Sequence, residues 1–255
     1  MKDSSKRFGN LFAFAALAIG AGGAALAQTS PQSNNEQARA AFQAKDYELA
    51  RQKFSAACST DKVASACHDL GVMSENGWGA VANPVEARVF YRMACDMNYA
   101  ASCNNLGARN LEGKGGPKDL MAARALFQKA CTLNHAEACR VYGKFLELAY
   151  GGPLDIVGAR ATAKKACDLG SAEGCHNFGH YLMNAIGGLK DDAGSVQYFE
   201  KGCKSGFAES CRSMAIIYQW GMGGVVPSAV EANRLFALAC DLGSIASCKT
   251  IGREQ

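Results

Sequence analysis

The chain has 255 residues, of which 49% are hydrophobic and 20% are charged, and its formal net charge is +4 at pH 7. So small a charge, with no cluster of lysine or arginine, argues against nucleic-acid binding. The 12 cysteines are many for this length and indicate a disulfide framework or metal sites.

Residues 1–27 have the features of a secretory signal peptide. Lys2, Lys6 and Arg7 precede the apolar run LFAFAALAIGAGGAALA, and small residues end it at Ala27. This run is short and rich in Gly and Ala, so we expect cleavage after Ala27 and no membrane span afterwards. The next cysteine is Cys58, which argues against lipid attachment to a new N-terminal cysteine. We expect a periplasmic or secreted protein.

Residues 28–37 are polar and lack an apolar period, which predicts a flexible leader. From residue 38 the apolar residues recur at helical spacing, first around Phe42 and then around Phe54, with the turn AKD between the two sets.

The cysteines form six pairs that recur every 36 or 37 residues. The members of a pair are eight positions apart, or nine in the first pair: Cys58/Cys67, Cys95/Cys103, Cys131/Cys139, Cys167/Cys175, Cys203/Cys211 and Cys240/Cys248. In an oxidising compartment such cysteines form disulfides, and the tight knuckles of structural zinc sites are missing from the sequence.

Two disulfide pairings are compatible with helices packed in antiparallel pairs. Consecutive cysteines can pair across each short turn, or Cys139 can pair with Cys167 and the others likewise. The second arrangement leaves Cys58 and Cys248 over, whereas consecutive pairing uses all twelve, so we favour consecutive pairing.

Alignment on the cysteines predicts the fold. Small residues recur eight and one positions before the first cysteine and mostly aromatic residues four before it, which places them on one face of a helix. Glycine stands four positions after the second cysteine in five of the six units: Gly71, Gly107, Gly143, Gly179 and Gly252. Because glycine is costly within a helix, we expect a close neighbour there.

Glycine-rich breaks such as GKGGP separate the units, and Asp119, Asp155 and Asp191 stand near the next helix starts. The GKGGP break is no phosphate-binding loop, because Gly-Lys-Ser/Thr is missing. The sequence thus predicts an all-α, right-handed αα-superhelix (solenoid) of six disulfide-clamped helix pairs over residues 38–255.

The motif A-x₃-F/Y-x₂-A-C, then x₇-C-x₃-G and a Gly-rich loop, resembles the Sel1-like repeats, which are relatives of the tetratricopeptide repeat. The paired cysteines resemble those of the Helicobacter cysteine-rich proteins. The resemblance covers residues 38–255, and its first unit is closer to a tetratricopeptide pair, as suits a cap. It implies a scaffold that binds a protein or peptide. As an alternative it implies a penicillin-binding or weakly β-lactam-hydrolysing protein, with a β-lactam or peptidoglycan-like ligand.

Residues for catalysis or metal binding are scarce. The only Ser-x-x-Lys is Ser59 to Lys62, and the companion motifs of serine β-lactamases are missing from the sequence. Among the four histidines, His176 and His180 could share a helix face, but no third ligand is evident. We therefore predict no catalytic residue, cofactor or metal site.

Three aromatic residues are candidates for partner binding. The sequence predicts that Trp78 and Trp220 lie in Gly-rich loops and that Tyr150 lies at the comparable position. Aromatic side chains on loops are frequent anchors of interfaces, although the same residues could instead fill gaps between units.

A peptide map without reduction tests the pairing. We expect six links between consecutive cysteines and no free thiol in the exported protein. A link between Cys139 and Cys167, found by mass spectrometry, would contradict it.

Overall fold

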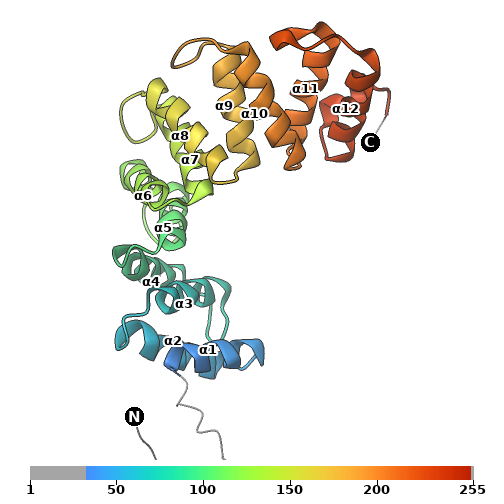
Figure 1. Ribbon diagram of the computed structural model, residues 1–255. Coiled ribbons are helices and arrows are strands. Elements are labelled where there is room, and N and C mark those ends of the chain that lie inside the picture. The colour runs from blue at the N-terminus through green and yellow to red at the C-terminus, as the bar shows by residue number, and fades with distance from the viewer. Residues whose placement is uncertain (1–32, 254–255) are drawn as a thin grey trace, which may run out of the picture. The chain divides into compact units, whose positions relative to one another are not determined.

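The computed structural model describes residues 33–253, so the proposed signal peptide and residues 28–32 lie outside the described part. Within it the chain is all-α, as predicted, and no strand is formed there. The helices are α1 (Asn34–Gln43), α2 (Tyr47–Ser59), α3 (Ala64–Asn76), α4 (Pro84–Asp96), α5 (Ala100–Glu112), α6 (Leu120–Thr132), α7 (Ala136–Glu147), α8 (Ile156–Asp168), α9 (Ala172–Met183), α10 (Asp192–Lys204), α11 (Ala208–Trp220), the short 3₁₀ helix η1 (Met222–Gly224), α12 (Ala229–Asp241) and α13 (Ile245–Thr250). They stack in chain order (Figure 1).

The first helix begins earlier than predicted. Ser33 caps α1 by accepting a hydrogen bond from the N–H of Glu36, whose carboxylate in turn accepts one from the N–H of Ser33. This capping box stabilises a helix start. The predicted leader 28–37 is therefore wrong for residues 33–37, which are the cap and first turn of α1.

Side-chain caps also fix the first helix of each later pair. The carboxylate, amide or hydroxyl oxygen of the residue before the helix accepts a hydrogen bond from the N–H three positions on. The capping residues are Asp46, Asn83, Asp119, Asp155, Asp191 and Ser228. The acidic residues noted in the sequence are thus helix caps.

Six disulfides join consecutive cysteines. Each closes the turn between the first and second helix of a pair, with Cα–Cα distances from 4.3 Å for Cys167–Cys175 to 4.8 Å for Cys58–Cys67. The other four are Cys95–Cys103, Cys131–Cys139, Cys203–Cys211 and Cys240–Cys248. No free cysteine remains in residues 33–253.

The helices meet in two kinds of junction. Helices joined by a disulfide turn, such as α4 and α5, pack less extensively than helices joined by a Gly-rich loop, such as α3 and α4. The covalent bonds are therefore placed at the less extensive of the two packing interfaces.

At the larger junction an aromatic ring lies over a glycine. A Cβ on Gly71 would come within 2.6 Å of the Tyr91 ring, and one on Gly107 within 3.1 Å of the Phe127 ring. Gly179 and Phe199 repeat the contact at 3.1 Å. These glycines therefore make room for the next pair, as predicted.

Two units depart from this contact. Gly143 faces the Thr162 hydroxyl, because α8 has the small Ala163 where its counterparts carry a ring. Gly252 follows α13 with φ of 70° and has no atom within 4 Å of an added Cβ. The expectation of a close neighbour is wrong for Gly252, which lies in the turn after the last helix.

The Gly-rich loops fold back onto their own unit. Gly115 has φ of 77°, and a Cβ there would clash with the carbonyl of Pro84 at the start of α4. An arginine of the first helix holds such a loop: Arg124 donates hydrogen bonds to the carbonyls of Tyr150 and Pro153, at 3.4 and 2.9 Å. Arg160 does the same one unit later, with Ile186 and Leu189. Each of these loops is thus held by an arginine that donates hydrogen bonds to its backbone carbonyls.

None of the helices in residues 33–253 combines the length and the apolar character that a membrane crossing needs.

The ring-over-glycine contact can be tested with Gly71→Ala. We expect the free energy of unfolding to fall by about 1–3 kcal/mol, because the Tyr91 ring must shift and overpacking outweighs the gain in helix propensity. Thermal unfolding followed by circular dichroism measures the change. Gly107→Ala should lower the free energy of unfolding less, because an added Cβ there lies farther from the neighbouring ring. A melting temperature of Gly71→Ala equal to or above that of the unmodified protein would contradict the interpretation.

Candidate functional site

The second helices of the pairs share one half-buried surface. We call it the second-helix face and define it as the side chains one, two and five positions after the second cysteine on α3, α5, α7, α9 and α11. Its members include His68, Asp69 and Val72 on α3, Asn104, Asn105 and Ala108 on α5, and Arg140, Val141 and Lys144 on α7. Figure 1 shows α3, α5 and α7 on one side of the stack and α4, α6 and α8 on the other.

Side chains at the edges of this face join neighbouring second helices directly. The Nδ1 of His68 lies 2.7 Å from the hydroxyl of Ser102, and Arg140 forms an ion pair with Glu173 at 2.9 Å. Glu75 binds Arg109 at 2.7 Å. Such links join α3 to α5 and α7 to α9.

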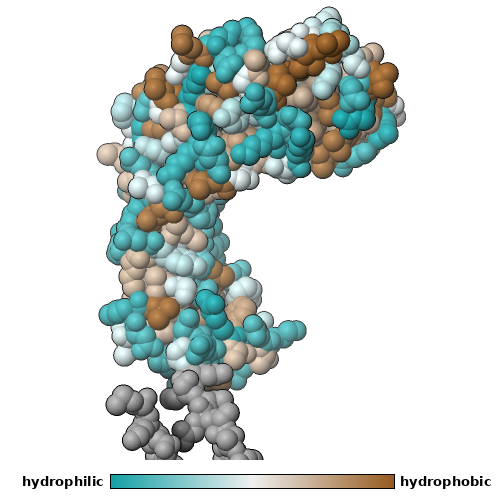
Figure 2. Space-filling view, in the orientation of Figure 1, coloured by the Kyte–Doolittle hydropathy of each residue, from teal (hydrophilic) through white to brown (hydrophobic). Residues whose placement is uncertain are grey.

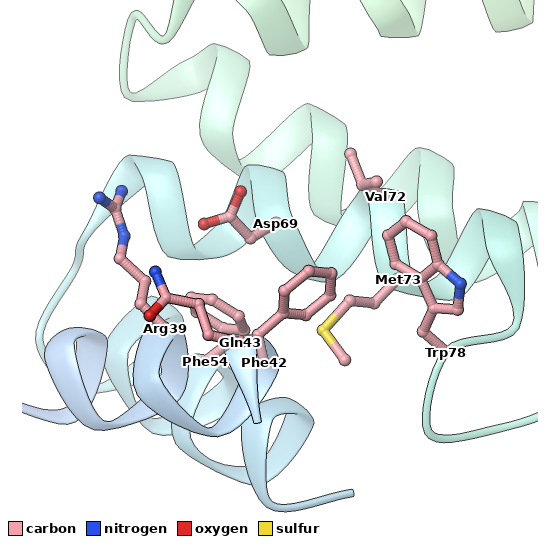
Figure 3. Close-up of a pocket in the computed structure, with 8 residues that line it drawn as sticks. All are labelled: Arg39, Phe42, Gln43, Phe54, Asp69, Val72, Met73 and Trp78. Carbon is pink, nitrogen blue, oxygen red and sulfur yellow. The ribbon is translucent and has the colours of Figure 1, made fainter. Parts of the chain in front are cut away.

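A hollow lies at the first end of this face, between α1 and α3. Its volume is about 170 Å³, and its lining residues are Arg39, Phe42, Gln43, Phe54, Asp69, Val72, Met73 and Trp78. Figure 3 shows the rings of Phe42 and Trp78 and the Met73 side chain along its apolar part. In this hollow α1 lies beside α3, in the position that the second helix of a preceding repeat would occupy.

The aromatic walls of this hollow support one another. Phe42 and Trp78 meet edge to face with centroids 5.2 Å apart, and Trp78 stacks on Tyr47 at 6.0 Å. Trp78 is half-buried, so it fills the gap between α1, α2 and the first Gly-rich loop and also lines a cavity. The gap-filling interpretation made from the sequence therefore describes this side chain, and partner binding by Trp78 stays a prediction.

The rim of the hollow carries two opposite charges. Asp69 is half-buried and Arg39 is exposed. Burial raises the pKa of Asp69, and the charge of Arg39 partly opposes this. No ion pair or hydrogen bond of the Arg39 side chain is formed within residues 33–253. The Arg39 guanidinium is thus balanced only by the longer-range charge of Asp69 on the same rim.

A second hollow of about 210 Å³ lies between α5 and α7, lined by Leu111, Arg140, Val141, Lys144, Phe145, Leu148 and Tyr150. Four of its seven lining residues stand at the same offsets after the second cysteine as residues of the first hollow. Trp78 and Tyr150 both lie eleven positions after a second cysteine, and Met73 and Phe145 both lie six after it. Tyr150 meets Phe145 edge to face at 5.7 Å and is 45% exposed. The two hollows are equivalent sites two repeats apart.

Trp220 does not belong to this series. It is the last residue of α11, nine positions after Cys211, and is 70% exposed. The sequence placed it in a Gly-rich loop, which is wrong, because the helix continues to Gly221, whose left-handed backbone ends it. The structure thus unites two of the three aromatic candidates by position and leaves Trp220 apart.

The histidine pair is not assembled into a metal site. His176 lies between the rings of Phe199 and Phe207, with centroids 5.4 and 5.3 Å away, and His180 is exposed beside Tyr181. Within residues 33–253 no three His, Cys, Asp or Glu side chains gather as a metal ion would require.

Ser59 stands at the wrong end of a helix for a serine nucleophile of the Ser-x-x-Lys type. It is the last residue of α2, and its hydroxyl donates a hydrogen bond to the carbonyl of Ser55 at 2.6 Å. The partial charge of a helix C-terminus is negative and would disfavour an oxyanion there.

The sequence did not reveal the other walls of the hollows. Phe42 and Arg39 come from α1, and Leu111 from the end of α5, so each hollow combines residues of adjacent second helices. The signal that could have found them is the shared offset of Trp78 and Tyr150, which marks equivalent places in two units.

A further row of apolar side chains lies at the starts of the first helices. Val85, Met121, Val157 and Val230 each occupy the second position of their helix and are 61% to 77% exposed. Figure 2 shows apolar residues in small patches between polar ones on the face that it presents. Single exposed apolar residues are normal for proteins.

The sequence profile of the Sel1 repeat matches residues 64–99, 100–135, 172–207 and 208–244, more than half of the chain. The chain belongs to the Sel1 repeat family. Each matched segment of this Sel1 repeat protein runs from the start of a second helix through the next first helix. The unmatched residues 136–171 form the same pair, α7 and α8, and contain Ala163 in place of an aromatic ring.

Two solved structures with Sel1-like repeats share this fold. The chain is 24% identical to a Sel1 repeat protein from Oxalobacter formigenes, over 86% of this chain and 87% of that one, with a TM-score of 0.76. It is also 24% identical to a protective antigen of uropathogenic Escherichia coli, with a TM-score of 0.80, over 86% of this chain and 47% of that longer one. Cysteine-rich protein B of Helicobacter pylori is 30% identical over 52% of this chain and 95% of its own, with a TM-score of 0.43. No curated protein of known function matches the chain by sequence.

The buried histidines predict a loss of stability in acid. Burial lowers the pKa of His176 to about 4 from 6.5, so the unfolded chain binds a proton there before the folded protein does. Stability is then complete above about pH 6.5 and falls as the pH drops towards 4, by on the order of 3 kcal/mol for this residue. Urea unfolding at about pH 6.5 and pH 4 measures the free energy of unfolding. Between these pH values it should fall less in His176→Phe than in the unmodified protein, because phenylalanine keeps an aromatic ring there but cannot bind a proton.

His180→Phe is the matched control, because His180 is exposed on the same helix. An unchanged pH dependence in His176→Phe would show that His176 is not a source of the acid sensitivity.

Proposed function

We propose that this Sel1 repeat protein is an exported scaffold that binds a protein or peptide partner on its second-helix face. The observation that carries the proposal is the pair of equivalent apolar hollows, which lie next to Trp78 and Tyr150 on that face. A rigid surface with repeated apolar hollows suits a polypeptide, because a polypeptide can present several side chains at fixed intervals.

Disulfides support the export part of the proposal. Six bridges with no free cysteine in residues 33–253 are expected in an oxidising compartment outside the cytosol. The charged and apolar N-terminal segment 1–27 fits a signal peptide that is removed on export. The periplasm and the extracellular medium both satisfy this chemistry.

The β-lactam alternative receives less support. Its one candidate nucleophile, Ser59, already donates a hydrogen bond to Ser55 and stands at the C-terminus of α2. No group that could activate it as a base contacts its hydroxyl within the described residues.

Site-directed photo-crosslinking tests the proposal. A photoreactive amino acid in place of Ala108, on α5 between the two hollows, should capture a specific partner from envelope extract of the producing cell. The same amino acid in place of Gln197, which is exposed on the first helix α10, should capture little. Reduced and alkylated protein is the second control, because the ordered surface depends on the bridges.

Equal capture at both positions, or capture that persists after reduction and unfolding, would count against the second-helix face as the binding surface.

A further inference from the structure

We propose that two copies of this protein pair through the edge of the stack where the Gly-rich loops meet the first helices. We call it the loop edge and define it as residues 81–85, 117–121, 153–157, 189–193 and 226–230. These residues line neither of the two hollows. The inference therefore goes beyond the proposed function and does not depend on it.

The loop edge exposes apolar side chains at repeated positions. They are 60% to 89% exposed, and they are Val81, Val85, Met121, Leu154, Val157, Leu189, Val226 and Val230. Acidic residues are common in the first turn of a helix, yet the second residue of α4, α6, α8, α10 and α12 is apolar in every case. One exposed apolar residue needs no explanation, but a row of them indicates an interface.

Contacts between loops and helices make this edge continuous along the stack. A Cβ on Gly115 would lie 3.0 Å from the backbone N of Val85, and one on Gly151 would lie 2.8 Å from that of Met121. The same close approach recurs at the starts of α8 and α10. Each Gly-rich loop therefore crosses the start of the preceding first helix, and the segments of the loop edge follow one another without a gap.

The order of the five segments suits a two-fold axis at the central one, 153–157. Segments 81–85 and 226–230 at the two ends carry no charge. Segments 117–121 and 189–193, on either side of the centre, each contain a Lys-Asp pair. A two-fold axis at the centre places the uncharged segments opposite each other and the charged segments opposite each other. The loop edge is thus complementary to a second copy of itself.

The charged segments match in this orientation. A two-fold axis reverses the direction of the second copy's edge, so Lys118 of one copy faces Asp191 of the other, and Asp119 faces Lys190. The two carboxylates are held in place because each caps a helix. Asp119 accepts a hydrogen bond from the N–H of Ala122 at 2.9 Å, and Asp191 is bound likewise at 2.7 Å.

The exposed area is sufficient for a reversible dimer. A fully exposed aliphatic side chain offers on the order of 100 Å² of apolar surface, so the apolar residues of the loop edge together offer roughly 600 Å². Two edges would bury roughly 1,200 Å², at the lower limit of stable protein interfaces. The Asp155 carboxylates of the two copies lie near the axis and repel each other. The dimer should therefore dissociate at low protein concentration.

Sedimentation equilibrium of the oxidised protein tests the inference. The average mass should rise from that of one chain towards that of two as the concentration increases from about 1 to about 300 μM. Val157→Glu should raise the dissociation constant about tenfold or more, because it adds two buried charges near the axis. Ile245→Glu is the matched control. Ile245 is 60% exposed and begins α13, at the disulfide-turn end of the helices, so this change should leave dimerisation unaltered.

A double-mutant comparison tests the antiparallel orientation. Lys118→Glu should raise the dissociation constant about fourfold, because the new carboxylate faces Asp191 in both halves of the dimer. In an Asp191→Asn background, where the amide still caps α10, the same change should have a clearly smaller effect. Thermal unfolding of each variant verifies that it is folded.

A single-chain mass at every concentration, or an unchanged dissociation constant in Val157→Glu, would overturn the inference. An equal effect of Lys118→Glu in both backgrounds would overturn the two-fold arrangement. Binding of a monomer to phosphatidylcholine vesicles, lost in Val157→Glu, would assign the loop edge to a lipid surface instead. Crosslinking at Ala108 reports on the second-helix face, so its result is independent of all these outcomes.

Discussion

Every disulfide of this protein holds together two helices that pack only modestly against each other. Three of the larger interfaces, which lie across the Gly-rich loops, are secured by a ring that lies over a glycine, such as Tyr91 over Gly71. The smaller interfaces, across the cysteine turns, are secured by a covalent bond, which disfavours the open chain. Two different physical means thus alternate along the stack. Together they give each second helix a fixed place between its neighbours, and the candidate binding surface is composed of those second helices.

The candidate binding surface follows from this arrangement because each hollow has walls from two neighbouring helices of the stack. Polar links such as His68–Ser102 and Arg140–Glu173 set the distance between such helices, and the apolar side chains leave the space between them. At the first hollow α1 takes the part of the missing neighbour. The N-terminal cap therefore both closes the core and contributes to a potential ligand site. The β-lactam alternative has no comparable assembly, since Ser59 lies alone at the end of α2.

The sequence predicted the repeat well and the site only in part, for physical reasons. The helix pairs could be predicted because their signals are local. These signals are the spacing of the cysteines, the small residues, and the rings four positions before the first cysteine of most pairs, which together define one face of a helix. The start of α1 was missed, although Ser33 and Glu36 form a capping box that the sequence contains. Trp78 and Tyr150 were found, but Arg39 and Phe42 were not, because their convergence with Trp78 depends on how α1 packs on α3. Trp220 was misplaced because the length of α11 depends on Gly221.

The disulfides have a mechanical consequence. Each links residues only eight or nine positions apart, and none joins one helix pair to the next. Under a pulling force the pairs can therefore separate and their helices can unwind one after another. Only the segments between linked cysteines are withheld from extension, so the oxidised chain stretches about a fifth less far than the reduced chain. The covalent bonds hold the turn of each helix hairpin closed, and resistance to elongation comes from the non-covalent packing between the pairs.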